Sequence, residues 1–369
     1  MTLDFTVTDA ETDVHSAPPV SWSMSNILVF GRGNRVHYRN MAATGDDVRQ
    51  LCKIRDEHGN LRLVQCATGL MENMVAVCTS TGHIQVWDLV SNKMTAHWST
   101  KGVTAMQWNG QSLTVGGIRG TIRHYDTRIK ETAKMKEQSR KTTRHQAVIN
   151  SLSWNSDGKF LASGDESGTV HVWDSRQNAP LDVGDLIQRR RKMQHEGAVH
   201  ALAWCPWQSG VLASGDSAQD NTGTIRIWNV NSSPHPTSTN PTKLELDAQI
   251  TSLHFSTHCK ELLSTHGLGK STTSPPPNVH LDSMIFPFPS QPRPARFSNS
   301  VAVHRFPSLN QVCLVQAAQA SVAGSVLSPN GQRIVLAVPG ESKLKVWDVW
   351  GRKRELRRTS SILSGAGIR

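Results

Sequence analysis

Short segments that end in an aromatic residue recur along this sequence, and this recurrence constrains the fold more than any other feature. Within each segment, polar and apolar residues alternate as they do in a half-buried strand. In four copies the aromatic residue is a tryptophan followed by Asp or Asn. The strong copies close at Trp87, Trp173, Trp228 and Trp347, and three weaker copies close at Tyr38, Tyr125 and Phe306.

The clearest repeat covers residues 194–230. Residues 198–204 and 211–214 are apolar runs, residues 224–228 alternate, and turn-forming residues separate the three. Three short strands with tight connections and a closing tryptophan make up most of a propeller blade. WD repeats run roughly 40 to 45 residues, and extra length falls in loops. The seven closings therefore predict an all-β fold, a seven-bladed WD-repeat β-propeller over residues 21–350.

Three segments lie outside the repeats. We expect residues 1–20 to supply a strand that closes the ring against the last blade. Residues 268–300 are rich in Pro and Ser, and we expect them to form an insertion between two strands of blade six because proline removes ladder donors. Residues 351–369 form a basic tail that ends in Ile-Arg. Residues 130–144 form a basic connector without an apolar stripe.

Charge and cysteine content narrow the class of protein. The net charge is +11, but the cations cluster at residues 130–144, 189–192 and 352–358, in connections and the tail. Because these clusters do not form one aromatic-interleaved face, nucleic acid is not favoured as the main partner. The six cysteines include no C-x-x-C pair, which is typical of reduced thiols inside cells. No apolar run reaches membrane-spanning length.

Histidines recur where WD repeats often hold a buried network of His, Ser or Thr, Asp and Trp, and buried polar groups of this kind must be paired. We interpret these histidines as structural and expect no enzyme activity. In blade four Ser167 stands where the turn Asp is usual, so we expect that network to be incomplete. The network residues are His145, Ser163 and Trp173 in blade four, and His195, Ser214 and Trp228 in blade five.

Two other patterns resemble ligand sites without satisfying their chemistry. One candidate metal site consists of His254, His258 and Cys259. His254 and His258 are four residues apart, which corresponds to about 13 Å on a regular strand, too far to bind one ion. Residues 267–271 partly match the phosphate-binding motif G-x-x-x-x-G-K-[ST]. They lack its first glycine, and no helix is expected after them. We therefore expect neither a metal nor a cofactor.

Several stretches resemble the Fizzy/Fizzy-related family of coactivators of the anaphase-promoting complex, a ubiquitin ligase. The likeness covers roughly residues 20–369 apart from the insertion. It is carried by residues 195–215 and 225–229, by the His-Tyr-Asp-Thr-Arg ending at residues 124–128, by residues 259–267 and by the terminal Ile368-Arg369.

The resemblance implies a receptor that recruits proteins bearing D-box or KEN-box degrons to the ligase and activates it. Ile368 and Arg369 would dock on a ligase subunit, offering an apolar anchor, a guanidinium and a carboxylate. We expect a chain that is monomeric before docking, acts in the nucleus and cytoplasm, and contacts no membrane. A specialised role, for example in meiosis, stays open.

The degron-binding residues depart from the family pattern. Asp165 and Ser167 stand where the KEN receptor has paired asparagines, Gln249 matches a family Gln, and Ser321 replaces a family Arg. These changes predict weak or altered KEN recognition, so the D-box is the more favoured degron. The D-box groove lies between blades one and seven, where Glu341 and Asp4 are the candidate acidic residues.

The family's C-box, an Asp-Arg-Tyr-Ile-Pro-x-Arg motif ahead of the propeller, has no counterpart in this sequence. Two explanations stay open: the sequence is truncated, or the chain docks by its tail alone. Two other functions also stay open. One is a WD-repeat scaffold without a ligase-activating role, and the other is a basic propeller associated with nucleic acid.

Overall fold

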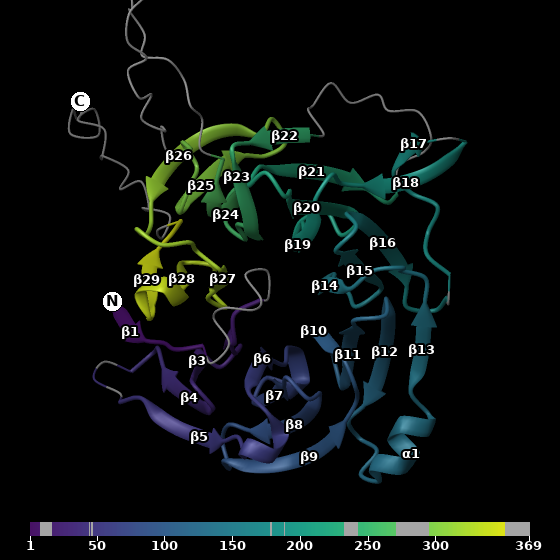
Figure 1. Cartoon of the computed structure of the whole chain (residues 1–369), viewed down its shortest axis with the longest axis vertical. Helices are drawn as coiled ribbons and strands as arrows, with labels where there is room; N and C mark the ends of the chain where they lie inside the picture. The colour runs from purple at the N-terminus through teal and green to yellow at the C-terminus, as the bar shows by residue number, and fades with distance from the viewer. Residues whose placement is uncertain are drawn as a thin grey trace, which may run out of the picture.

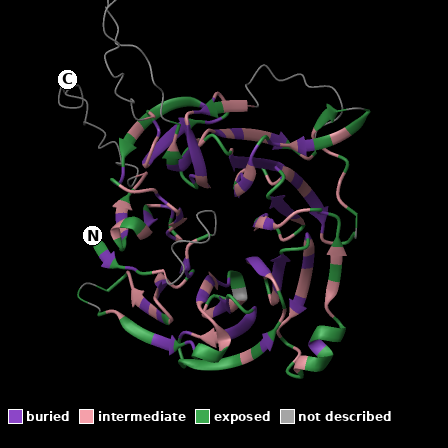
Figure 2. Ribbon diagram, in the orientation of Figure 1, coloured by how far each residue is buried: buried purple, intermediate pink, exposed green. Residues whose placement is uncertain are grey.

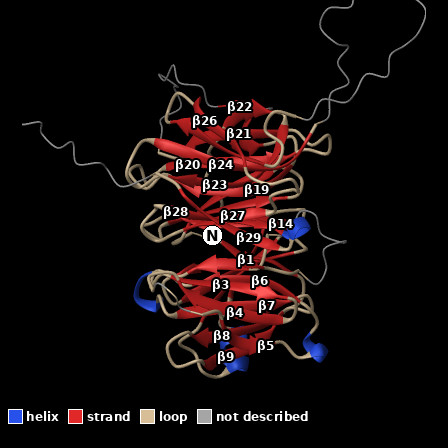
Figure 3. Cartoon of the chain, turned by 90° about the vertical axis from the view of Figure 1, so that its left-hand side faces the viewer, coloured by secondary structure: helices blue, strands red, loops and turns tan. Residues whose placement is uncertain are grey.

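The computed structural model describes residues 1–7, 17–43, 45, 47–177, 179–187, 189–231, 243–270 and 295–350. These residues form seven sheets set around a central axis, as the view down that axis shows (Figure 1). Seen from the side, the described chain is almost entirely strand and loop, with a few short helices (Figure 3). The prediction of a seven-bladed WD-repeat propeller is confirmed.

The first three blades are four-stranded antiparallel sheets. Blade one comprises β2 (Val20–Trp22), β3 (Ile27–Arg32), β4 (Arg35–Asn40) and β5 (Arg49–Lys53). Blade two comprises β6 (Leu61–Cys66), β7 (Met74–Thr79), β8 (His83–Asp88) and β9 (Lys93–Ser99). Blade three comprises β10 (Val103–Asn109), β11 (Ser112–Gly117), β12 (Thr121–Asp126) and β13 (Arg140–Thr143).

Blade four has a fifth strand. It comprises β14 (Ile149–Trp154), β15 (Phe160–Asp165), β16 (Thr169–Asp174), β18 (Arg190–Gln194) and β17 (Asp185–Ile187). Blade five comprises β19 (Ala198–Trp204), β20 (Val211–Ser217), β21 (Gly223–Asn229) and β22 (Lys243–Leu246). Blade six comprises β23 (Ala248–Phe255), β24 (Glu261–Gly269), β25 (Ser300–Arg305) and β26 (Asn310–Gln316).

Blade seven joins the two ends of the propeller. Its inner strands are β27 (Gly324–Leu327), β28 (Arg333–Val338) and β29 (Lys343–Asp348), and its outer strand is β1 (Thr2–Asp4) from the N-terminus. Leu3 lies opposite Leu344 in the antiparallel ladder, and Phe5 is fully buried just beyond it. This pairing covers the free edge of β29, which is how a propeller ring is closed.

The blades pack face to face, and apolar side chains of neighbouring blades form the core. Buried residues lie mainly on the inner strands of the blades (Figure 2). Three glycines on second strands show how closely neighbouring blades approach. A Cβ on Gly116, Gly164 or Gly215 would lie 2.5 to 2.7 Å from a branched side chain of the next blade, and those side chains are Ile149, Val199 and Ile250. Only glycine leaves room for these contacts.

Two connections differ from the expectation. The basic connector at residues 130–144 holds a short helix, α1 (Thr132–Glu137), with Met135 buried beneath it, and its end forms β13, the outer strand of blade three. The insertion in blade six is shorter than residues 268–300, because β24 runs to Gly269 and β25 begins at Ser300. Residues 271–294 of that insertion lie outside the described residues.

The closing residue of blade six is also different. The ladder places His304 opposite Leu262, as it places Trp173 opposite Leu161 in blade four. His304 therefore occupies the closing position that the sequence pattern gave to Phe306. Phe306 instead packs edge-on against Trp207 and Phe255, between blades five and six. Three 3-10 turns complete the described structure: η1 (Asp56–His58), η2 (Gly69–Met71) and η3 (Pro339–Glu341).

Candidate functional site

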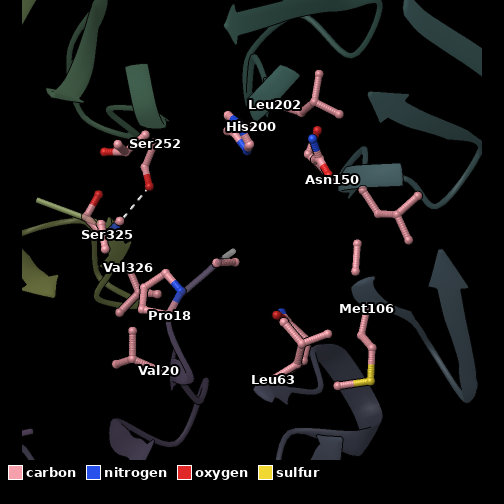
Figure 4. A pocket seen from close by; sticks show the side chains of 18 of the residues that line it. Pro18, Val20, Leu63, Met106, Asn150, His200, Leu202, Ser252, Ser325 and Val326 are labelled. Carbon is pink, nitrogen blue, oxygen red and sulfur yellow. Dashed lines mark hydrogen bonds between the residues drawn. The ribbon is translucent and has the colours of Figure 1, made fainter. Parts of the chain in front are cut away.

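A cavity opens at the centre of the ring, and the inner strands of all seven blades line it (Figure 4). Its wall combines apolar side chains with serine hydroxyls, amides and His200. The backbone N–H of Ser325 donates a hydrogen bond to Oγ of Ser252 at 2.9 Å, linking blades seven and six across the wall. One apolar or small side chain from each blade lines the cavity: Val20, Leu63, Met106, Leu152, Leu202, Ser252 and Val326.

The structure brings two of the degron-binding candidates, Gln249 and Ser321, to this cavity. Gly267 lies between them, since a Cβ there would be 3.1 Å from Oε1 of Gln249 and 3.1 Å from Oγ of Ser321. Nε2 of Gln249 donates a hydrogen bond to Oδ1 of Asn221 at 3.0 Å. This part of the wall is polar and uncharged. Its amide and hydroxyl groups can donate hydrogen bonds to a short peptide and accept hydrogen bonds from it.

Asp165, in contrast, is buried beneath the surface of blade four and is only 1% exposed. Its Oδ2 lies 2.7 Å from Nδ1 of His145, and its Oδ1 accepts hydrogen bonds from Oγ of Ser167 and from the backbone N–H of Thr169. Burial acts to raise the pKa of this carboxyl, but these hydrogen bonds outweigh burial and hold the pKa below its usual range. Asp165 is therefore a structural group, unavailable to repel a bound Glu.

The blade-four network is complete, contrary to the expectation from Ser167. Nε2 of His145 and Nε1 of Trp173 lie 2.7 Å and 2.8 Å from Oγ of Ser163, and Asp165 supplies the acid at the other side of the His145 ring. The acid simply stands two residues earlier than expected. Each buried polar group has a partner, so the network fixes the turn between β15 and β16.

Blade five repeats this arrangement with one looser contact. Nε2 of His195 lies 2.6 Å from Oγ of Ser214, which also accepts a hydrogen bond from Nε1 of Trp228 at 2.7 Å. Asp216 takes the position of Asp165, but its Oδ2 lies 3.5 Å from Nδ1 of His195. All these groups are buried, which fits a structural role rather than a catalytic one.

Asp4 and Glu341 both lie near the start of β29, with Asp4 on the side of blade one and Glu341 beside the connection from blade six. Asp4 pairs with Lys343 in the ladder, and Glu341 precedes that residue by two positions. The Asp4 side chain is 85% exposed and lies 3.8 Å from the guanidinium of Arg32 on β3. Its exposed carboxylate can pair with a cationic side chain of a partner.

Glu341 is the more constrained of the two carboxylates. Its Oε2 lies 2.6 Å from Nζ of Lys345, its Oε1 accepts a hydrogen bond from the backbone N–H of Gln319 at 2.9 Å, and the side chain is 23% exposed. The hydrogen bond from Lys345, followed by the one from Gln319, holds the pKa of Glu341 below its usual value. A cationic ligand would have to compete with Lys345.

The three residues weighed as metal ligands serve other contacts. Nε2 of His254 lies 2.8 Å from Oγ of Ser325, and Nε2 of His258 lies 2.7 Å from the carbonyl oxygen of Asn330. Cys259 contacts Ser256 and Glu261. Within the described ranges, no group of three or more His, Cys, Asp or Glu side chains could hold a metal ion. No described helix is both long and apolar enough to cross a membrane.

The apolar side chains that line the cavity were not predicted from the sequence, although the first strands of several blades carry them. In blades two to five, an apolar residue within the first strand lines the cavity, and these residues could have indicated it: Leu63, Met106, Leu152 and Leu202. Strand alternation identifies two faces but does not say which face turns toward the axis. Ile368 and Arg369 lie outside the described residues.

The ring of seven blades and the buried histidine networks define a WD-repeat β-propeller. The model of the CDC20/Fizzy WD40 domain matches residues 10–347, and the chain belongs to this family. That model describes a WD40 domain and not a catalytic one.

Curated relatives support the assignment across most of the chain. Protein FIZZY-RELATED 1 of Arabidopsis thaliana is 27% identical over 347 residues, covering 93% of this chain and 61% of the relative. "Cell division cycle 20.5, cofactor of APC complex", also from Arabidopsis thaliana, is 27% identical over 337 residues, covering 90% and 64%. WD repeat-containing protein srw1 of Schizosaccharomyces pombe is 28% identical over 338 residues, covering 90% and 51%. The chain thus spans less than two thirds of these relatives.

A solved structure agrees in fold. A chain in the crystal structure of a mitotic checkpoint complex superposes with a TM-score of 0.73 and 25% sequence identity. The match covers 95% of this chain and 91% of that chain.

Proposed function

We propose that this chain is a substrate-recognition and activating subunit of the anaphase-promoting complex, a ubiquitin ligase. One observation carries the proposal: the CDC20/Fizzy family model matches the propeller nearly from end to end, over residues 10–347. Relatives that are named as cofactors of this complex add support. The chain's role is to bind degron-bearing proteins on the propeller and to bring them to the ligase.

Docking on the ligase is assigned to the terminal Ile368-Arg369. A terminal carboxylate and a guanidinium can each form charge-assisted hydrogen bonds, and the Ile side chain can fill an apolar pocket. The propeller is monomeric before docking and acts in the nucleus and cytoplasm. A meiotic role is one specialisation that fits a divergent sequence.

The D-box is the favoured degron because the junction of blades seven and one carries acid. The exposed carboxylate of Asp4 and the partly exposed Glu341 both lie near the start of β29, and each can pair with a cationic side chain of a D-box peptide. A carboxylate paired with a guanidinium gives strong, directional recognition. We expect D-box peptides to compete with Lys345 for Glu341.

The KEN box is disfavoured because the wall of the central cavity lacks a cation among the described residues. Asp165 is buried and engaged with His145, so it contributes no repulsion at the surface. Ser321 leaves the cavity wall near Gln249 without a cation. A Glu side chain would therefore meet hydroxyl and amide groups but no guanidinium.

The test is a ubiquitination assay with purified anaphase-promoting complex, the full chain and a D-box substrate. The variant Ile368→Ala/Arg369→Ala should lose both binding to the ligase and ubiquitination. The control Arg357→Ala/Arg358→Ala removes two charges from the same tail and should keep both activities. Tail-dependent binding without ubiquitination would indicate a docking-competent competitor. Absence of binding by the full chain would contradict the proposal and favour a scaffold.

A second arm separates degron recognition from docking. Asp4→Asn combined with Glu341→Gln should weaken binding of a fluorescent D-box peptide by at least about tenfold, since both carboxylates are lost. Ligase binding through the tail should be unchanged in this variant. If the D-box peptide binds the parent chain and this variant with equal affinity, Asp4 and Glu341 do not belong to the degron site.

A further inference from the structure

Blade four carries a hairpin that the propeller does not need. The other six sheets have four strands, but blade four adds β17 outside β18, and the β17–β18 hairpin stands out from the rim (Figure 1). Four strands complete a blade. The fifth strand therefore adds surface to the ring without closing it.

The hairpin is held at its base and at one side. Met193 is buried between blades four and five, and β18 pairs with β16 only through Met193 and Gln194. The rest of that edge of β16 is occupied by the segment around Leu181, whose backbone N–H donates to the carbonyl of Val172 at 2.7 Å. Residues 190–192 are thereby kept away from β16.

A salt bridge fixes the outer strand relative to the neighbouring blade. Oδ2 of Asp185 on β17 lies 2.7 Å from a guanidinium nitrogen of Arg226 on β21. This contact joins the hairpin to blade five, so the hairpin presents a defined surface. The outer edge of β17 pairs with no other described strand.

The exposed surface of the hairpin combines apolar and cationic side chains. Leu186 is 75% exposed and Ile187 is 37% exposed. The register sets Leu186 opposite Arg191 and Ile187 opposite Arg190, so each apolar side chain shares a face with a guanidinium. Among the described residues, no carboxylate lies within ion-pair distance of residues 189–192.

We propose that the β17–β18 hairpin is a docking surface for an acidic, extended segment of a partner protein. The segment pairs with the free edge of β17, which offers unpaired backbone donors and acceptors. Its apolar side chains contact Leu186 and Ile187, and its carboxylates bind the unpaired cations of β18. Charge complementarity selects an acidic occupant over a neutral or basic one.

The proposal is tested by fluorescence anisotropy with the full chain and two labelled peptides. One peptide repeats Glu-Glu-Val-Val over eight residues, so that each face of the extended segment carries both carboxylates and apolar side chains, and the other replaces each Glu with Lys. Saturable binding of the acidic peptide is expected, together with slower hydrogen exchange of the amides of residues 185–187. Arg190→Glu combined with Lys192→Glu should weaken this binding by at least about tenfold.

A matched control separates a site from the general field of a basic protein. Lys134→Glu combined with Lys136→Glu makes the same change in charge on exposed residues of α1, at the same spacing. This control should change the affinity by less than about threefold. Leu186→Gln should weaken binding while leaving the melting temperature unchanged, because the side chain is exposed.

Three outcomes would overturn the proposal. The first is equal weakening by the two charge-reversal pairs, which would mean non-specific attraction. The second is tighter binding of a DNA duplex at the same hairpin, which would make it a nucleic-acid surface. The third is no saturable peptide binding, in which case the cations only guard the edge of β17 against aggregation.

Discussion

Nδ1 of His145 lies 2.7 Å from Oδ2 of Asp165, and both side chains are almost fully buried. The pair joins the chain just before β14 to the end of β15, and Ser163 and Trp173 extend it across the blade. Removing one partner of such a pair leaves a buried polar group without its hydrogen bond, which costs more than the pair itself contributes.

Asp165→Ala should therefore lower the free energy of unfolding by about 3 kcal/mol, because His145 loses its carboxylate partner in a buried site. Urea unfolding followed by tryptophan fluorescence measures this change. The control Asp157→Ala, in the exposed turn between β14 and β15, should change the value by less than about 0.5 kcal/mol. Equal effects of the two substitutions would show that the network does not stabilise the blade.

The period of the strands, rather than any single motif, made this fold predictable. Alternation, turn residues and closing aromatics indicated a repeated strand unit at seven places along the chain. Two errors concern the ends of strands. The sequence did not show where the strands end, so it could not tell that His304 and Asp165 lie on strands while Phe306 and Ser167 lie just beyond them. The ladder register and the hydrogen bonds of the folded blade decide between them.

The hairpin at residues 185–194 and the strand at residues 140–143 were missed for a different reason. Both are rich in Arg and Lys, and such sequences have little intrinsic preference for strands. Their pairing depends on neighbouring strands, as when β13 pairs with β12 through four residue pairs. Asp4 and Glu341 stay predicted degron-binding residues; the contact of Glu341 with Lys345 could not be predicted from the sequence, because it depends on the fold around the start of β29.

Five histidines, two buried and three partly buried, should make the propeller sensitive to mild acid. Burial lowers the pKa of His266 to about 3 and the pKa of His124, His171, His254 and His304 to about 4. In the unfolded chain these rings take up protons near pH 6.5. The unfolded state therefore binds more protons between pH 6.5 and 4, and stability is complete above this window and falls through it.

Each such histidine should contribute a slope of about 1.4 kcal/mol per pH unit inside this window. Urea midpoints measured at pH 7.5, 6.5, 5.5 and 4.5 give the total slope. His304→Gln should reduce that slope by about one histidine's share. An unchanged midpoint from pH 6.5 to 4.5 in the parent chain would contradict the buried neutral state of these rings.

Ser321→Arg should create KEN-box binding. Ser321 lies at the central cavity beside Gln249, and an Arg there would supply the guanidinium that the uncharged wall lacks. A labelled KEN peptide should bind the variant at least about tenfold more tightly than the parent chain. Ser156→Arg, an exposed position in the turn after β14, should leave the affinity unchanged. If both variants gain the same affinity for the KEN peptide, the added charge attracts the peptide non-specifically and Ser321 does not mark a KEN site.

Asp247 holds together the two ends of the blade-six insertion. Its carboxylate oxygens accept hydrogen bonds from the backbone N–H groups of Arg296 and Phe297 at 2.7 Å and 3.0 Å, and its carbonyl accepts one from Lys270 at 2.8 Å. A Cβ at Gly269 would collide with Ala295, which shows how close the two ends lie. A short turn can therefore replace the connection between them.

Replacing residues 271–294 with a Gly-Ser-Gly linker should leave the melting temperature within about 2 °C of the parent value, since the blade's strands and the clamp are retained. Asp247→Ala in the full chain should instead lower the melting temperature by several degrees, because it removes two backbone caps. The same substitution should speed cleavage by trypsin after Lys270 and Arg296, as read by mass spectrometry. Asp185→Ala, which removes a salt bridge at the exposed rim of blade four, serves as the control and should alter neither measurement. A large loss of stability on replacing the insertion would show that its residues, rather than the clamp, support blade six.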